Sequence, residues 1–301
     1  MQNNKTENFT KYSGGNVMKT WIYIILFTLL IGLIGSLLAS YFQQPLFFYI
    51  GSAVSICMAV WSYWFSDKAV LKMANAKPLE QGDNMELQRL VAQLASNAGL
   101  PTPKIYIVED PSPNAFATGR DPQHGVVAFT TGILSLLNKD ELAGVTAHEL
   151  AHIANRDTLL MTVVAVFANI LQSVIHYMYF FGGNNSEGGN SNNAFVGIAV
   201  SIAISILAPL AATIIQMAVS RNREFLADAT GAQISGYPKG LADALQKIHN
   251  YPQGLQSVNP SISHLYISNP EKESETHHTP WYAKLFMTHP PVTERVAALM
   301  K

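Results

Sequence analysis

The sequence predicts a mainly α-helical protein with a small β-sheet, an α+β fold, built on about four transmembrane helices. Hydrophobic residues make up 49% of the 301 residues and charged residues only 13%, whereas about 25% are charged in typical soluble proteins. The charge deficit is concentrated, because residues 21–66 and 194–220 contain no Asp, Glu, Lys or Arg. Each run exceeds the roughly 20 apolar residues that a membrane-spanning helix needs. The chain is therefore expected to be a multi-pass membrane protein.

The N-terminal part predicts a transmembrane hairpin over residues 18–66. Residues 1–17 are polar and are expected to be a disordered extension. A first span runs from Trp21 to about Leu38, and a second from Leu46 to Phe65, with a tight turn at Gln43–Pro45 between them. A cleavable signal peptide is the alternative for the first span. The apolar core is too long for one, and a second apolar segment follows almost at once.

Residues 67–157 have the character of a soluble domain. Apolar residues at helical spacing predict a helix over Glu86–Asn97. Short strands are expected at Lys104–Val108, after the turn that begins the segment Ser112–Gly119, and at Gly125–Thr130. A further helix starts at Asn138–Glu141, where acidic residues suit the positive end of the helix dipole.

Residues 158–220 predict a second transmembrane hairpin. Its first arm, Thr158–Phe181, has the length of a span, and a buried amphipathic helix is the alternative. A Gly/Asn/Ser loop over 182–193 leads into the second arm, Ala194 to about Val219, where Pro209 is expected to kink the helix. Residues 221–301 form the second soluble part, with one helix marked by leucines and a last helix over Val292–Lys301.

The distribution of basic residues predicts the orientation in the membrane. The two short loops within the hairpins contain no Lys or Arg, whereas the opposite ends of the spans do. The positive-inside rule then places both termini and both soluble parts in the cytoplasm. The basic residues concerned are Lys19, Lys68, Lys72, Arg156, Arg221 and Arg223.

The candidate metal site begins with His148-Glu149-Leu150-Ala151-His152 on the predicted helix. Histidines four residues apart project from the same face, so that both imidazoles can bind one zinc ion. Glu224, at the start of the second soluble part, offers a third ligand, and Asp228 follows it one turn later. His148, His152 and Glu224 would leave a fourth position on the zinc open for water, as in catalytic zinc sites.

Roles for the neighbouring acids follow from this geometry. Glu149 is the candidate general base that removes a proton from water and passes it to a leaving amine. Asp228 is expected to accept a hydrogen bond from a ligand imidazole and so fix its tautomer. The alternatives are that Glu224 neutralises Arg221 or Arg223 at the surface, and that Asp228 is an ordinary helix charge. A structural zinc would favour cysteine ligands, and the single cysteine lies within an apolar run.

His289 has two readings on the residues alone. It precedes Pro290 and Pro291 and could cap the last helix. Alternatively it points into the zinc cleft, with Arg295 six residues later, and stabilises the oxyanion of a tetrahedral intermediate. Nucleic acid is not an expected partner, because the net charge is −1 and no basic patch with interleaved aromatic residues is present.

Four motifs together resemble the HtpX family of bacterial membrane-bound zinc metalloproteases. These proteases are gluzincins, a zincin-type fold with glutamate as third ligand, and are related to the type I CAAX prenyl proteases. The motifs are Ser112–Gly119, His148–His152, Glu224–Asp228, and Thr288–Pro291 with Glu294–Val296. They occur in the family's order, and the likeness extends from about Met18 to the C-terminus.

The resemblance implies one zinc per chain on His148, His152 and Glu224, and Glu149 as the base. It also implies that His289 and Arg295 face the active site. It further implies an edge strand over Val126, Val127, Ala128 and Phe129, along which a substrate chain binds in extended form, with Asn114 and Ala115 also in contact. The family's location is the bacterial plasma (inner) membrane, and its role is quality control of damaged or misassembled membrane proteins under stress.

The leading hypothesis is therefore an endopeptidase that acts on membrane proteins and unfolded polypeptides from the cytoplasmic side of the lipid bilayer. A second hypothesis is the processing of one specific lipidated or C-terminal peptide. A third is a membrane adaptor that retains a protease fold without activity. The sequence does not indicate an oligomeric state.

Overall fold

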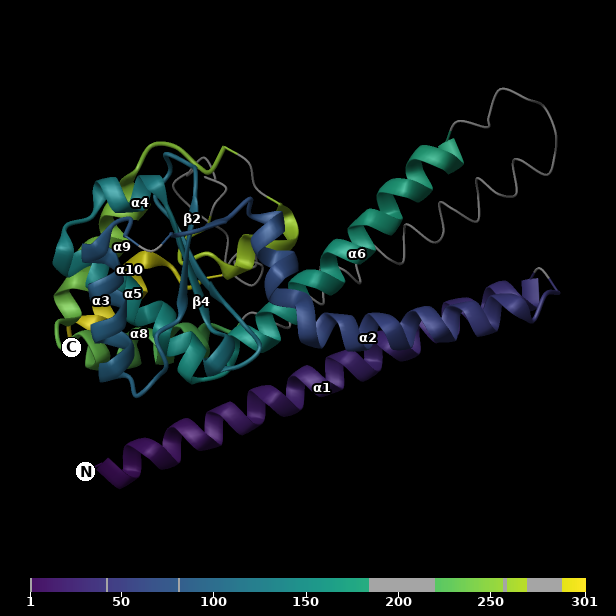
Figure 1. Ribbon diagram of the computed structural model, residues 1–301, viewed down its shortest axis with the longest axis horizontal. Helices are drawn as coiled ribbons and strands as arrows, with labels where there is room; N and C mark the ends of the chain where they lie inside the picture. The colour runs from purple at the N-terminus through teal and green to yellow at the C-terminus, as the bar shows by residue number, and fades with distance from the viewer. Residues whose placement is uncertain (1, 42, 81, 184–219, 257–258, 270–288) are drawn as a thin grey trace.

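The computed structural model describes residues 2–41, 43–80, 82–183, 220–256, 259–269 and 289–301. A compact part encloses a small sheet, and three long helices reach beyond one side of it, the first of which also runs below the compact part in this view (Figure 1). The predicted loop over 182–193 (apart from its first two residues) and the predicted span over 194–219 with its Pro209 kink lie outside the described residues. The mainly helical class with a small mixed sheet is confirmed.

Helices α1 (Gln2–Tyr41) and α2 (Leu46–Met73) form an antiparallel hairpin around the predicted turn, where Gln43 has a φ of 53°. Both are long and apolar enough to cross a membrane, over Gly14–Leu33 and Phe48–Met73. The expectation that residues 1–17 are disordered is wrong, because α1 already begins at Gln2. Once a helix is nucleated, each added residue costs little, and α1 is also anchored near its polar end by the buried side chain of Asn16.

Helix α6 (Asp157–Gly183) follows α5 (Lys139–Ala154) after a bend of 83°. Its first half is buried: Phe167 stacks on Phe27 of α1 with ring centroids 3.9 Å apart, and apolar neighbours such as Val163 are fully covered. Among the described helices, α6 meets the requirements for a span only when it is counted together with α5 as one bent segment. The described part of the chain thus has two candidate spans, or three with the bent pair.

The sheet has the order β1-β2-β4-β3, in which β2 and β4 are parallel and the outer pairs are antiparallel. Strands β2, β3 and β4 match the predicted ones, whereas the two-residue β1 and helix α4 (Thr131–Leu136) had no sequence signal that we identified. The bounds are β1 (Lys77–Pro78), β2 (Lys104–Val108), β3 (Ala115–Thr118) and β4 (Val126–Thr130).

The expectation that Val126–Phe129 forms an edge strand is wrong. β4 pairs with β2 on one side and with β3 on the other, and all five of its residues are buried. The sequence does not contain the strand order, and a fully apolar strand is typical of a central position. The strand at this edge of the sheet is β3.

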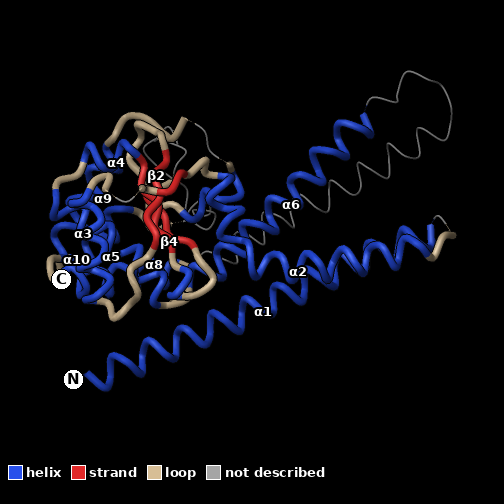
Figure 2. Tube along the Cα trace, viewed as in Figure 1, coloured by secondary structure: helices blue, strands red, loops and turns tan. Residues whose placement is uncertain are grey.

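Alternate residues of β4 point into two different cores. Val127 and Phe129 pack with the helices of the compact part, whereas Val126 and Ala128 pack with the ends of α2 and α6. The sheet therefore lies between the helices of the compact part and the membrane helices (Figure 2). Besides α4, the helices of the compact part are α3 (Met85–Asn97), α5, α8 (Arg221–Ser235), α9 (Pro238–Asn250) and α10 (Val292–Leu299). Two short 3₁₀ helices, η1 (Pro122–His124) and η2 (Pro260–Leu265), complete the described elements.

Helix α5 lies at the centre of the compact part. Asn138 and Glu141 form a capping box at its start, which satisfies backbone amides that the first turn leaves without partners. Two glycines allow its neighbours to approach closely. A Cβ on Gly144 would lie 2.4 Å from the backbone nitrogen of Leu241 in α9, and one on Gly231 of α8 would lie 2.8 Å from that of His148.

Replacing Gly144 by Ala is expected to destabilise the protein, because backbone atoms of α9 would have to move. Overpacking of this kind costs about 1–3 kcal/mol, which corresponds to roughly 3–10 °C in unfolding temperature. Calorimetry on the detergent-solubilised protein would measure the shift. Gly32→Ala is the control, since nothing lies within 4 Å of a Cβ there. Equal unfolding temperatures for Gly144→Ala and wild type would contradict the close packing of α5 on α9.

Candidate metal centre

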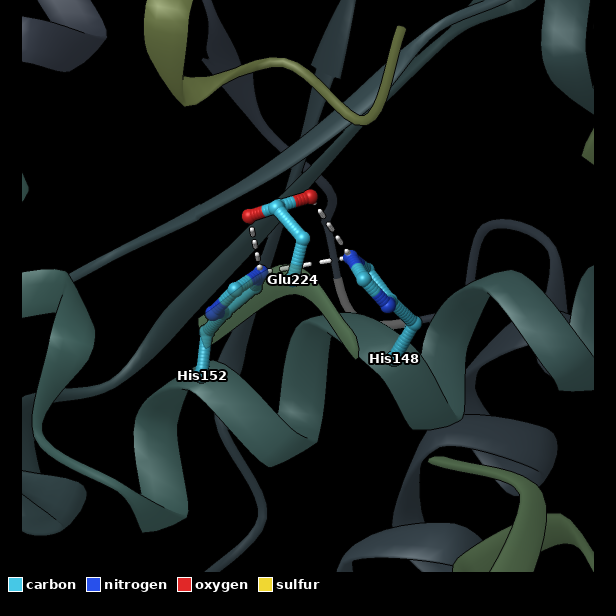
Figure 3. A group of neighbouring side chains, drawn as sticks. All are labelled: His148, His152 and Glu224. Atoms are coloured by element: carbon cyan, nitrogen blue, oxygen red, sulfur yellow. Dashed lines mark hydrogen bonds and ion pairs between the residues drawn. The ribbon is translucent and has the colours of Figure 1, made fainter. Parts of the chain in front are cut away.

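His148 and His152 lie one turn apart on α5, and Glu224 of α8 faces them both (Figure 3). All three side chains are buried, and one ligand atom from each lies within 4.8 Å of the others. The two Nε2 atoms are 3.2 Å apart. The Glu224 oxygens lie 3.9 Å from Nε2 of His148 and 3.5 Å from Nε2 of His152. The predicted third ligand and the two histidines therefore meet.

These separations fit a tetrahedral zinc ion. Zinc bonds to imidazole nitrogen and carboxylate oxygen are about 2.0–2.2 Å long, so that tetrahedral ligand atoms lie about 3.4 Å apart. The two Nε2 atoms are 3.2 Å apart, and the Glu224 carboxylate faces both of them, with Oε2 at 3.9 Å from His148 and Oε1 at 3.5 Å from His152. Two neutral nitrogens and one carboxylate are also a donor set that zinc accepts in catalytic sites.

Each histidine is backed by a carboxylate on its other nitrogen. Nδ1 of His148 lies 3.0 Å from Asp228 Oδ1, and Nδ1 of His152 lies 3.1 Å from Asp157 Oδ2. Each Nδ1–H donates to its carboxylate, so that each Nε2 atom keeps its lone pair, and the two lone pairs are directed at one point. A proton or a metal ion must occupy that point. The reading of Asp228 as an ordinary helix charge is wrong, because its side chain is buried.

Asp157 is a residue that the sequence analysis missed. It returns to His152 because α5 ends at Ala154, Arg156 adopts a left-handed conformation with a φ of 59°, and α6 departs at 83°. A non-glycine residue in this region is uncommon and is held there by its surroundings. The one available signal was a carboxylate five residues after a ligand histidine, at the junction of two helices.

The electrostatics of the ligands favour a cation. Burial lowers the pKa of His148 to about 4, so its ring is neutral at pH 7. Burial alone would raise the pKa of Glu224, but the charges of His289, His152 and Arg295 hold it well below its ordinary value. Glu224 is therefore ionised, and the reading of it as a surface carboxylate is wrong.

Burial would likewise lower the pKa of His152. The hydrogen bond to Asp157 and the charge of Glu224 outweigh burial and raise this pKa to about 9. In the absence of metal, a proton therefore resides between the two imidazoles. Binding of a metal there releases that proton.

Glu149 lies beside the ligands, with its carboxylate oxygen Oε1 buried and without a partner among the described residues. Burial raises the pKa of this carboxyl to about 7, against the opposing effects of His152, Arg295 and the Ala117 amide. A carboxylate with a pKa near neutrality both accepts and returns a proton readily.

Arg295 of α10 is fully buried behind His148. Its Nε and Nη2 atoms donate to the two Asp228 oxygens at 2.9 and 2.6 Å, and Nη1 donates to the Ile267 carbonyl at 3.0 Å. Its Nη1 also lies 3.7 Å from Glu224. The guanidinium thus neutralises two buried carboxylates and fixes the orientation of Asp228.

His289 lies on the other side of Glu224, and its Nδ1 is 3.0 Å from Glu224 Oε2. Its Nε2 is buried and has no partner in the part of the chain that the structure describes. The alternative that His289 caps the last helix is wrong, since the N-cap of α10 is Pro291.

The predicted substrate residues separate into two groups. Val126–Phe129 are buried in the central strand and present no free edge. Asn114 lies directly before β3, where its side chain donates to the Ser268 carbonyl and accepts from the Ala115 amide. The Ala115 carbonyl accepts from Ile267. The edge of β3 is therefore covered at Ala115 and Phe116 and continues to Ala117, whose amide faces Glu149, and Thr118.

Comparisons with known proteins agree with this site. Residues 81–301 match the model of peptidase family M48. The chain is 45% identical to a protease HtpX homolog of Desulfatibacillum aliphaticivorans, over 95% of this chain and 89% of that protein. It is 44% identical to a homolog of Ralstonia pickettii, over 95% and 96%.

Among solved structures, Ste24p of S. mikatae has a similar fold, with a TM-score of 0.52 and 18% sequence identity. The similarity covers 94% of this chain and 67% of Ste24p. The apolar helices, the candidate metal centre and the relatives agree with one another. The chain belongs to peptidase family M48, and it is a zinc metalloprotease of the membrane.

Proposed function

We propose that this metalloprotease cleaves damaged or misfolded membrane proteins at the cytoplasmic face of the bacterial inner membrane. The observation that carries the proposal is the paired imidazole lone pairs facing Glu224, with Glu149 beside them in a buried site. Support for the location comes from the direct continuation of the zinc-binding helix α5 into α6, which packs on the membrane hairpin. A substrate that reaches this site is held close to the bilayer.

We assign the zinc ion to His148, His152 and Glu224. Zinc supplies Lewis acidity, which polarises a peptide carbonyl and acidifies water at neutral pH. Glu149 removes a proton from the attacking water and then delivers it to the nitrogen of the leaving amine, so that the base is regenerated. The buried, unpartnered Oε1 of Glu149 supports this role.

His289 is assigned to the developing oxyanion. Its Nδ1 donates to Glu224, so Nε2 donates as well when the ring is doubly protonated. Arg295 receives a different role from the one that the sequence suggested. Three of its five N–H groups donate to Asp228 and to the Ile267 carbonyl. It is therefore a positioning residue for Asp228 and His148.

The substrate chain is proposed to pair with the outer edge of β3, in the β-augmentation mode. Tyr266 and Ile267 cover this edge at Phe116 and Ala115, which leaves the Ala117–Thr118 end. The Ala117 amide lies against Glu149. A substrate strand added there passes the metal centre along its backbone, which favours weak dependence on side chains.

The membrane topology is proposed to comprise four spans, with both termini and the active site in the cytoplasm. The positive-inside rule supports this orientation, because the basic residues flank one end of each apolar segment. The described helices that pass the length and hydropathy requirements agree with a first hairpin over α1 and α2. Labelling of single cysteines in the loops, in whole cells and inverted vesicles, would test the orientation.

Replacing Glu149 by Gln is expected to abolish proteolysis while zinc binding remains, because the amide cannot accept the proton. Loss of general-base catalysis costs about 10²–10⁴ in kcat. Zinc content and cleavage of an unfolded membrane protein would be measured together, after purification under chelator and return of zinc. Full activity with bound zinc would exclude the mechanism. If the wild-type protein made a single defined cut in one substrate and did not cleave unfolded membrane proteins, specific processing would be favoured instead.

Replacing Asp228 by Ala is expected to weaken zinc binding by about 10–100-fold, the usual effect of removing a partner of a ligand histidine. His148 loses its acceptor, and the charge of Arg295 is left without its main partner. Competition with a chelating dye would measure the zinc affinity. Asp243→Ala is the matched control, because that carboxylate is half-buried at the surface of α9 and pairs only with Lys239 among the described contacts. Equal zinc affinity in both variants would contradict the role of Asp228.

Replacing His289 by Ala is expected to lower kcat by about 10²–10³, the effect of losing one oxyanion donor, with a smaller change in KM. Steady-state kinetics on a quenched peptide would measure both, at a zinc concentration that saturates the site. His124→Ala is the control, since that histidine is exposed in η1. A rise in KM with unchanged kcat would place His289 in ground-state binding instead.

A further inference from the structure

We propose that Asn16 of the first membrane helix is a positioning residue of the zinc site, acting on His152 through Asp157. The inference deepens the proposed function and rests on it. It makes the N-terminal hairpin part of the metal site's support, in addition to its role in the membrane.

The contacts form a continuous chain from α1 to the metal centre. The Asn16 carboxamide nitrogen donates to Asp157 Oδ1 at 2.6 Å and to the Asn155 carbonyl at 3.0 Å. The other oxygen of Asp157 accepts from Nδ1 of His152 at 3.1 Å. Asn16 is only 6% exposed and Asp157 is fully buried. These residues are 141 positions apart in the sequence, so only the folded chain brings them together.

The division of the carboxylate oxygens gives Asn16 its effect. One oxygen of Asp157 is held by the amide of Asn16, which fixes the plane of the carboxylate and directs the other oxygen at His152. Arg223 lies 3.8 Å from the oxygen that Asn16 holds, which is ion-pair distance but beyond a hydrogen bond. Among the described residues, Asn16 is therefore the donor that orients Asp157. Partners of this kind set the ring orientation and the basicity of a ligand histidine.

The position of Asn16 on α1 indicates why a polar residue occurs there. It lies at the start of the apolar segment Gly14–Leu33, one turn before the buried Thr20, whose hydroxyl bonds back to the Asn16 carbonyl. Further along α1, Ile24 and Phe27 pack on α6. The docking of α1 on α6 thus delivers the Asn16 amide to the α5–α6 bend. By linkage, zinc binding should in turn stabilise the docked α1.

A purely structural role for Asn16 would also involve a buried hydrogen bond. The test must therefore separate a structural role from the positioning of Asp157. A double-mutant cycle on zinc affinity does this, because residues that act through one another are not additive. Zinc affinity would be measured by competition with a chelating dye in the full-length Glu149→Gln protein, which avoids self-cleavage. The variants are Asn16→Ala, Asp157→Ala and the two combined.

Asn16→Ala is expected to weaken zinc binding by about 3–30-fold and Asp157→Ala by about 10–100-fold. The combined variant should be no weaker than Asp157→Ala alone. Met18→Ala, at an exposed position of the same helix, should leave the affinity unchanged. Unchanged affinity in Asn16→Ala, or effects that multiply in the combined variant, would overturn the proposal. Failure of the Glu149→Gln parent to bind zinc would instead reject the proposed function on which it rests.

A charge exchange keeps the inference testable if Asn16→Ala unfolds. Asn16→Asp alone sets two carboxylates against each other and should weaken zinc binding more than Asn16→Ala. With Asp157→Asn added, the new amide nitrogen at position 157 can donate to the new carboxylate at position 16. The amide oxygen at position 157 remains to accept from Nδ1 of His152. The combined Asn16→Asp and Asp157→Asn variant should therefore recover part of the zinc affinity lost in Asn16→Asp. Absence of recovery in a folded protein would argue against the relay.

Discussion

The structure depends on one electrostatic constraint, the convergence of two imidazole lone pairs and a carboxylate in a buried space. The Nε2 atoms of His148 and His152 are 3.2 Å apart and face the ionised Glu224. Such a group is unfavourable in a low-dielectric interior unless a cation occupies its centre. Asp157 and Asp228 increase the negative charge, which Arg295 offsets at Asp228 and Arg223 offsets more distantly at Asp157. A cation is still needed between the three ligand side chains, and zinc would take that position.

The fold meets this constraint by packing helix α5 on every side. Close approach of α8 and α9 is permitted at Gly231 and Gly144, and Glu224 of α8 lies buried over the histidines. The sheet covers α5 from the membrane side, where alternate residues of β4 serve two separate cores. Rigid support of this kind matters for catalysis, because ligands and base must stay in place while charge develops on the substrate.

The membrane helices are continuous with this support. The bend at Arg156 joins α5 to α6 and turns Asp157 back toward His152. Helix α1 then covers α6 through the stacked rings of Phe27 and Phe167. The proposed role of Asn16 extends the same arrangement, since it makes the geometry of the zinc site depend on a docked membrane hairpin. An enzyme with this coupling would lose metal affinity when its membrane domain is disturbed.

The sequence by itself determined the groups whose geometry is local. Histidines four residues apart share a helix face, and Asp228 follows Glu224 by one turn, so both pairs were predictable from helical periodicity. The strand segments and the capped start of α5 were likewise local.

Tertiary structure alone decided the relations between distant segments. Strand order placed β4 at the centre of the sheet instead of at its edge, and the bend after α5 made Asp157 a partner of His152. Docking of α1 brought Asn16 to Asp157, and the packing of α10 turned Arg295 toward Asp228. These contacts join residues far apart in the chain, where no periodicity connects them, and only the burial of the whole core selects them.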